Sequence, residues 1–133
     1  MANNYCISSS FIPVEEDKIE RAEQIVLRAT NKLETSEDGY VGYEVEVEEK
    51  GVWIYSDEYL TPEHAAELVQ DLVEELDLPG IHVVSWACTC SKPRIDKFGG
   101  GAFAVQKGKD TVWIDAAYAA RKEAEALAAK EAV

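Results

Sequence analysis

The chain has 133 residues, and its 26 acidic side chains outnumber the 13 basic ones to give a formal net charge of −13. A chain of this length forms one domain, placed here over residues 1–133, and buries roughly two thirds of its unfolded surface without needing a metal, a disulfide or a cofactor. The charge excludes direct binding to duplex nucleic acid or to an anionic membrane surface, and it favours partners with a basic surface.

Nothing in the sequence predicts a membrane span or secretion. The longest apolar runs fall far short of the roughly twenty residues that a spanning helix needs. Polar Asn3 and Asn4 follow Met1, where a signal segment would be apolar. Three cysteines are too few for a disulfide framework. We therefore expect free thiols in a reducing cytoplasm.

The first half of the chain switches between two periods of hydrophobicity. Residues 5–12 alternate apolar and polar side chains, which is typical of a strand covered on one face. From residue 15 to about residue 33 the apolar positions return at helical spacing, with acids in the first turn near the positive end of the helix dipole. Alternation resumes over 43–48 and 52–55 around a Lys50-Gly51 turn, which predicts a hairpin.

The second half begins with a helix whose start has a clear signal. Thr61 is a candidate cap and Pro62 suits the first helical position. A buried stripe follows at helical spacing: Ala65, Leu68, Val69, Leu72, Val73 and Leu76. We then expect a buried strand over 81–90, a polar loop ending in three glycines, a strand over 102–106, a tight turn at 107–110, and a strand over 111–114.

Asp115 is placed to cap a last, alanine-rich helix that begins at residue 116 and lies within residues 116–133. Its intrinsic helix propensity is high, but Tyr118 and Leu127 are almost its only large apolar side chains. We expect it to lie at the edge of the domain and to fray at its end.

The order of elements is β-α-β-β-α-β-β-β-α, without an internal repeat. Its first six elements match a split βαβ arrangement, in which both helices cover one face of an antiparallel sheet. We predict an α+β protein with a ferredoxin-like core, β-α-β-β-α-β, extended by a C-terminal β-hairpin and helix. The second sheet face is then open, covered by the C-terminal elements, or buried in a homodimer.

An ordered row of carboxylates is predicted on the first hairpin. Glu44, Glu46 and Glu48 alternate with apolar residues, so they share one face at about 6.8 Å spacing along the strand. Asp57 and Glu58 follow the second hairpin strand and extend the negative surface. The row is either a solvated face or a protein-binding face that imitates the charge of a nucleic-acid backbone, because carboxylates can engage Lys and Arg side chains that bind phosphates.

A local reversal of charge marks the loop after residue 90. The segment contains only one acid but three basic residues, Lys92, Arg94 and Lys97. It ends with Gly99, Gly100 and Gly101. Glycines allow close backbone approach, and backbone N–H groups beside cations can bind an anion or a nucleotide. The spacing fits neither a Walker loop nor a dinucleotide fingerprint. The segment is therefore either a plain hairpin connection or an anion-binding loop.

The cysteines and tryptophans allow two interpretations each. Cys88 and Cys90 share a strand face, but their spacing and that of Cys6 do not fit a zinc site. They are predicted to be small buried hydrophobes, with a nucleophilic Cys90 as a weaker alternative. The strand tryptophans could stack nucleic-acid bases, yet the surrounding negative charge favours packing instead; they are Trp53, Trp86 and Trp113.

Two segments carry a resemblance to a known family. Residues 85–94 read SWACTCSKPR and residues 98–102 read FGGGA. Together they resemble a segment found in a group of small uncharacterised proteins of bacteriophages, plasmids and bacteria, and residues 4–6 and 52–55 extend the likeness. The resemblance implies a mobile-element origin and assigns no reaction.

Charge and resemblance together favour a non-enzymatic interaction protein. We expect it to bind a basic surface of a host protein in a nucleic-acid-handling or defence complex, as an inhibitor or nucleic-acid mimic, in the host cytoplasm. The alternative is an anion- or nucleotide-binding domain, or a small enzyme, that uses the loop from Lys92 to Gly101.

Overall fold

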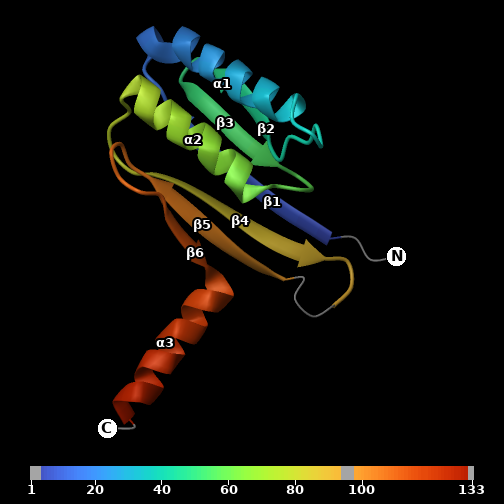
Figure 1. The fold of residues 1–133 in the computed structure, drawn as a ribbon, viewed down its shortest axis with the longest axis vertical. Coiled ribbons are helices and arrows are strands. Elements are labelled where there is room, and N and C mark those ends of the chain that lie inside the picture. Colours follow the sequence, from blue (N-terminus) through green and yellow to red (C-terminus); the bar gives the residue numbers. More distant parts are fainter. Residues whose placement is uncertain (1–3, 94–97, 132–133) are drawn as a thin grey trace.

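The structure, a computed structural model, describes residues 4–93 and 98–131 of the chain (Figure 1). These residues form six strands, three α-helices and one short 3-10 turn. In chain order the elements are β1 (Asn4–Pro13), η1 (Glu16–Lys18), α1 (Ile19–Glu34), β2 (Glu44–Glu48), β3 (Gly51–Ser56), α2 (Pro62–Leu76), β4 (His82–Cys90), β5 (Gly99–Val105), β6 (Val112–Asp115) and α3 (Ala116–Glu131).

The strands form one six-stranded sheet in the order β2-β3-β1-β4-β5-β6, and all neighbouring strands pair antiparallel. The α+β class and the antiparallel sheet are thus confirmed. Strand β1 changes partner along its length, because it pairs with β4 over Asn4–Ile7 and with β3 over Ser8–Pro13. This change divides the sheet into two halves that meet at the middle of β1.

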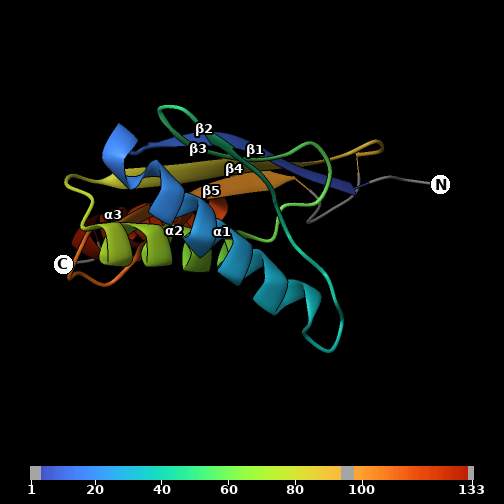
Figure 2. The same ribbon diagram turned by 90° about the horizontal axis from the view of Figure 1, so that it is seen from above.

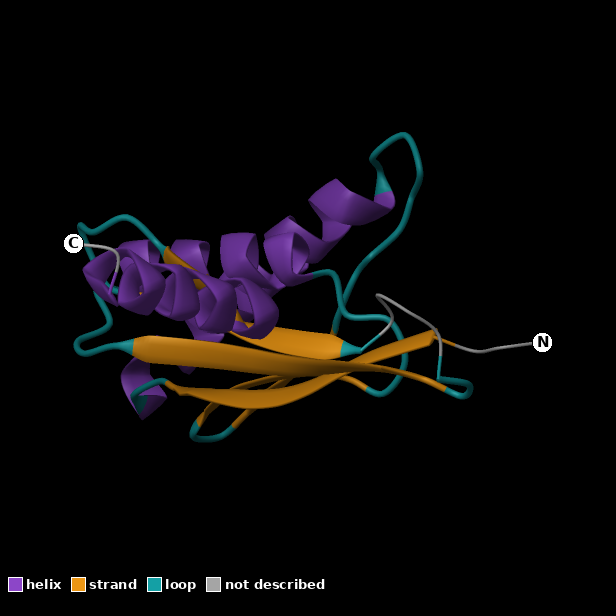
Figure 3. Cartoon of the chain, turned by 90° about the horizontal axis from the view of Figure 1, so that it is seen from below, coloured by secondary structure: helices purple, strands orange, loops and turns teal. Residues whose placement is uncertain are grey.

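Helices α1 and α2 lie side by side on one face of the sheet, as Figures 2 and 3 show from opposite sides. The alternation of strand side chains fits this layer: Val52, Ile54, Val84 and Phe103 point to the helices and are almost fully buried. The stripe predicted on α2 is buried in full. Apolar burial of this kind contributes about 25 cal/mol per Å² and supplies the main stabilisation of the fold.

The helix ends agree with the sequence in position but not in every detail. Asp115 caps α3, because its Oδ1 accepts the N–H of Tyr118 at 2.9 Å. Thr61 occupies the cap position of α2, yet its side chain makes no capping hydrogen bond. It packs against Gly42 instead, where a Cβ would lie 2.2 Å from the Cβ of Thr61. The predicted threonine cap therefore acts through backbone position and packing alone.

The three glycines belong to a strand, so the predicted loop ending in glycine is wrong. Gly99, Gly100 and Gly101 pair with Cys88, Ala87 and Trp86 of β4. A Cβ on Gly101 would lie 2.4 Å from the carbonyl oxygen of Ile114 and 2.8 Å from Cζ2 of Trp86. Glycine is needed here because the neighbouring strand and an indole ring occupy the space of a side chain.

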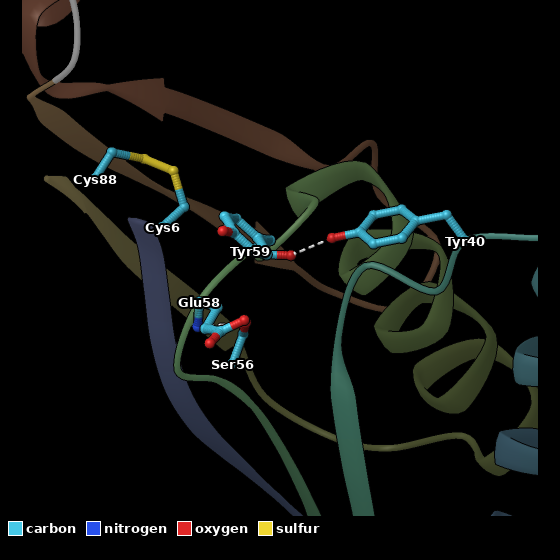
Figure 4. The surroundings of a disulfide bond; sticks show 6 residues. All are labelled: Cys6, Tyr40, Ser56, Glu58, Tyr59 and Cys88. Atoms are coloured by element: carbon cyan, nitrogen blue, oxygen red, sulfur yellow. Dashed lines mark hydrogen bonds between the residues drawn. A yellow bond between two sulfur atoms is a disulfide. The ribbon is translucent and has the colours of Figure 1, made fainter. Parts of the chain in front are cut away.

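The expectation of free thiols is also wrong, because Cys6 and Cys88 form a disulfide (Figure 4). The two residues are directly opposite in the β1–β4 ladder, with Cα atoms 4.1 Å apart. Only the register of strands far apart in sequence brings them together, and spacing alone does not reveal that register. Cys90 remains a free, half-buried thiol.

Candidate interaction surface

The three glutamates of β2 lie in a row on the sheet face opposite the helices. Glu44, Glu46 and Glu48 are exposed, while the alternating Val45 and Val47 pack against the core. Because β2 is an edge strand, the carboxylates stand at the border of the open face. The structure places these side chains as the sequence predicts, and we call them the acidic row.

An aromatic strip lies next to the acidic row. Trp53, on β3, pairs with Glu46 of β2 on one side and with Phe11 of β1 on the other. Trp53 and Tyr55 stack with ring centroids 3.9 Å apart. The Nε1 of Trp53 donates a hydrogen bond to Oγ of Ser9 at 2.9 Å. The rings of Trp53 and Tyr55 therefore stack along β3 on the open face, where they remain half-buried, and the hydrogen bond to Ser9 is the contact of Trp53 across to β1.

Tyr55 connects the strip to the acidic row. Its hydroxyl donates to Oε1 of Glu46 at 3.4 Å. Desolvation raises the pKa of Tyr55, and the negative charges of Glu46 and Glu44 raise it further. The phenol therefore stays neutral and keeps its proton as a hydrogen-bond donor beside the carboxylates.

Several acids of the helix layer have cationic partners, in contrast to the acidic row. Nη1 of Arg28 on α1 bonds Oε1 of Glu75 on α2 at 2.9 Å, and Nζ of Lys32 bonds Oε1 of Glu67 at 2.7 Å. The hydrogen bond with Arg28 lowers the pKa of Glu75. Within residues 4–93 and 98–131, no ion pair involves a carboxylate of the acidic row. None of the cations in these two ranges therefore forms an ion pair with the row, and its exposed carboxylates face solvent.

A cleft opens where β1 changes partner. It has a volume of about 580 Å³ and is lined by Ile7, Ser8, Ser9, Ser56, Asp57, Ser85, Trp86 and Ala87. We call it the serine cleft. The β1–β4 ladder ends at the pair of Ile7 and Ala87, and beyond it Oγ of Ser8 donates to the carbonyl oxygen of Ser85 at 2.6 Å. A side chain therefore bridges the two strands where backbone pairing stops.

The hydroxyls of the serine cleft keep unused hydrogen-bonding capacity. Oγ of Ser9 accepts from Trp53, and Oγ of Ser56 accepts from the N–H of Glu58 at 3.4 Å, so each oxygen keeps a second lone pair that can accept a hydrogen bond. Asp57 adds an exposed carboxylate to the lining. Hydroxyls and a carboxylate together suit a cationic group whose N–H donors need several oxygen acceptors.

Asp57 and Glu58 lie in the segment after β3, which is tied to β1 by its backbone. The N–H of Cys6 donates to the carbonyl oxygen of Glu58 at 2.6 Å, and the N–H of Leu60 donates to the carbonyl oxygen of Cys6 at 2.9 Å. Figure 4 shows this segment beside the disulfide. The structure thus brings Asp57 into the serine cleft, and both carboxylates are exposed.

The alternative anion-binding loop lies partly outside the described residues. Lys92 is exposed in the turn after β4, whereas the three glycines are committed to β5. Arg94 and Lys97 lie outside the described residues. Lys107, in the next turn, pairs with Asp77 at 2.5 Å.

A smaller cavity of about 270 Å³ lies between α1 and α2, and its polar groups have partners. Nδ1 of His64 accepts the N–H of Gly42 at 3.0 Å, and the Tyr43 hydroxyl lies 3.2 Å from Oγ1 of Thr30. Partial burial raises the pKa of Tyr43. These hydrogen bonds hold residues 41–43, which precede β2, against α1 and α2.

No group of three or more His, Cys, Asp or Glu side chains in residues 4–93 and 98–131 is arranged to hold a metal ion. None of the helices in those residues has the length and apolar character needed to cross a membrane. Comparisons with protein-family models, with curated proteins and with solved structures gave no match.

The sequence indicates the acidic row but not the serine cleft. Alternation alone places the three glutamates on one face. The serines come from three strands, and they meet only because β1 leaves β4 for β3. The run Ser8-Ser9-Ser10 in a strand is the one available signal, since serine is less common in strand interiors than β-branched or aromatic residues.

Proposed function

We propose that the protein is a non-enzymatic interaction protein that uses the open sheet face to bind a basic surface of a host protein. The observation that carries this proposal is the uncompensated acidic row beside the Trp53–Tyr55 stack. Bacteriophage or other mobile-element origin, and a nucleic-acid-handling or defence complex as the target in the host cytoplasm, are part of the proposal. The resemblance of residues 85–94 and 98–102 supports the origin.

The acidic row suits a surface that normally binds nucleic acid. Lys and Arg side chains arranged for phosphates form charge-assisted hydrogen bonds equally with carboxylates. Single exposed pairs contribute only about 0.2–1 kcal/mol each, so affinity needs several pairs together with an apolar centre. Trp53, Tyr55 and Phe11 supply that centre directly beside the row.

The serine cleft supports the same function as the seat of one cationic side chain of the partner. Asp57 supplies a charged acceptor, and the serine oxygens supply neutral ones. Ile7 and Ala87 offer an apolar wall to the aliphatic stem of a lysine or arginine. The row, the strip and the cleft then form one continuous binding face.

We propose that the first four strands and the two helices α1 and α2 form a ferredoxin-like core, which presents this face. The order β2-β3-β1-β4 with α1 and α2 on one side supports it. We place β5 and β6 as the C-terminal hairpin that widens the sheet, with α3 following. In this arrangement the core helices leave the opposite face available to a partner.

Neutralising the acidic row should weaken binding more than an equal loss of charge elsewhere. We expect Glu44→Gln, Glu46→Gln and Glu48→Gln together to reduce affinity for an oligo-arginine peptide at least about tenfold. The matched control is Glu16→Gln, Glu20→Gln and Glu23→Gln, exposed positions at the start of the helix layer. It should change affinity about twofold or less near 0.15 M salt, where distant charges are screened. Calorimetric titration measures both.

The same variants serve in affinity capture from a bacterial lysate. A host protein retained by the wild type and by the control triple, but lost with the row triple and at raised salt, supports the proposal. Equal losses for the two triples in both assays contradict it, because they would mean that only net charge matters.

Asp57→Asn tests the cleft separately. Loss of its carboxylate should weaken oligo-arginine binding about threefold, the size expected for one partly exposed pair. Asp110→Asn, in the exposed turn before β6, is the matched control and should have no measurable effect. Identical behaviour of the two variants would remove the serine cleft from the binding face.

A further inference from the structure

The last strand of the sheet is an edge that exposes apolar side chains on both faces. Val112, Trp113 and Ile114 are 57%, 45% and 54% exposed. Strand β6 pairs with β5 along one side only, and in the described residues no strand pairs with its other side. Such an edge offers free backbone N–H and C=O groups together with apolar surface, which is a template for adding another strand.

The opposite edge of the sheet is protected. Strand β2 carries the acidic row, and like charges on an edge oppose pairing with an identical edge. Residues 112–114 of β6 carry no charged side chain that would oppose such pairing. The two edges therefore differ in their capacity to accept a second sheet.

Helix α3 extends the exposed apolar surface of β6. It runs away from the body of the domain (Figure 1), and Tyr118 and Leu127 are each 61% exposed. An isolated helix of about this length is marginal in water even when rich in alanine. Packing against a partner would supply stabilisation that the rest of this chain does not give it.

Charge restricts which partner can reach this surface. Residues 112–131, which form β6 and α3, carry three cations, Arg121, Lys122 and Lys130, against four acids, Asp115, Glu123, Glu125 and Glu131, a formal charge of −1. The other residues carry the remaining −12 of the net charge of −13. Two copies repel each other across every strongly acidic face, and this nearly neutral segment is where that repulsion is weakest.

We propose that β6 and α3 form a self-association surface for a second copy of this chain. The β6 strands pair antiparallel about a twofold axis, so that the sheet continues from one copy into the other. A four-residue strand cannot bury the roughly 800 Å² per partner of a stable interface. Helix α3, with 16 residues and a length of about 24 Å, provides the remaining area. The acidic row stays free at the far edges of the dimer.

Sedimentation velocity of the full chain tests this surface directly. At about 100 µM, far above a Kd on the order of 1 µM, we expect the wild type to be a dimer. Ile114→Lys should weaken association at least about tenfold, because it places a charge in the strand pairing. Its side chain is already exposed, so the fold should tolerate the change, and circular dichroism checks this.

Val83→Lys is the matched control, since Val83 is 55% exposed on the open face of β4. It should leave the dimer intact. Leu127→Lys, on α3, provides a second test if Ile114→Lys fails to fold, and it should also weaken association. Slower amide hydrogen exchange in β6 at high protein concentration is the expected accompanying result.

Two outcomes overturn the inference. One is a wild-type chain that stays monomeric at about 100 µM. The other is a dimer that Val83→Lys dissociates while Ile114→Lys and Leu127→Lys do not, which would place the contact on the open face. That face carries the proposed partner site, so the oligo-arginine assay separates failure of this inference from failure of the proposed function.

Discussion

Replacing Cys6 and Cys88 with serine should lower the free energy of unfolding by about 4.5 kcal/mol, the value that chain entropy gives for a closed loop of this size. The two residues are separated by 82 positions, and the loop between them contains both core helices and strands β2 and β3. Removing the link lets the unfolded chain expand, while the β1–β4 hydrogen bonds of the folded state remain. The melting temperature should fall by roughly 10–20 °C.

Cys90→Ser is the matched control for this double variant, because Cys90 is free. It should leave the unfolding free energy almost unchanged. Urea denaturation with and without a thiol reductant measures the effect, and a thiol assay in denaturant should find one reactive cysteine of three in the native preparation. Three reactive thiols, together with no effect of reductant on stability, would contradict the link.

The disulfide also affects the proposed binding face through the backbone. Cys6 holds the segment from Glu58 to Leu60 by hydrogen bonds in both directions. That segment follows Asp57, which lines the serine cleft. Loosening the start of β1 should therefore disturb the cleft before it disturbs the acidic row, which depends on the distant β2–β3 hairpin.

Local periodicity explains why much of the fold was predictable. The α2 stripe from Ala65 to Leu76 repeats at 3.6 residues, and only one helix face can bury it. The acidic row alternates with Val45 and Val47, so its common face follows from the pleat of any strand. Neither inference needs knowledge of which strands are neighbours.

Features that depend on strand register were not predictable in this way. Cys6 and Cys88 are both visible in the sequence, yet only the ladder places them opposite each other. The serine cleft requires β1 to change partners, and the run of serines from Ser8 is a local signal that does not identify the strands on either side. The prediction for the glycines failed for a related reason, since glycine is typical both of loops and of strands that make close contacts.

The glycines of β5 give the second large effect on stability. Gly101→Ala should cost about 3 kcal/mol, the upper end of ordinary overpacking, because the new Cβ would meet a backbone oxygen at 2.4 Å and the Trp86 ring at 2.8 Å. The backbone oxygen belongs to Ile114 in β6, so relief requires β5 and β6 to move apart and the indole to shift as well. Tryptophan fluorescence during urea unfolding should report both the loss and the altered environment of Trp86.

Gly99→Ala is the control within the same strand, since a Cβ there meets no atom within 4 Å and its backbone has no positive φ. It should change stability by less than about 0.5 kcal/mol, with a small gain from the less flexible unfolded chain. If the glycines instead served close approach of a ligand, the two alanines would have similar, small effects on the free protein. A clear difference between neighbouring glycines therefore favours strand packing, and equal effects would restore the loop from Lys92 to Gly101 as a candidate binding site.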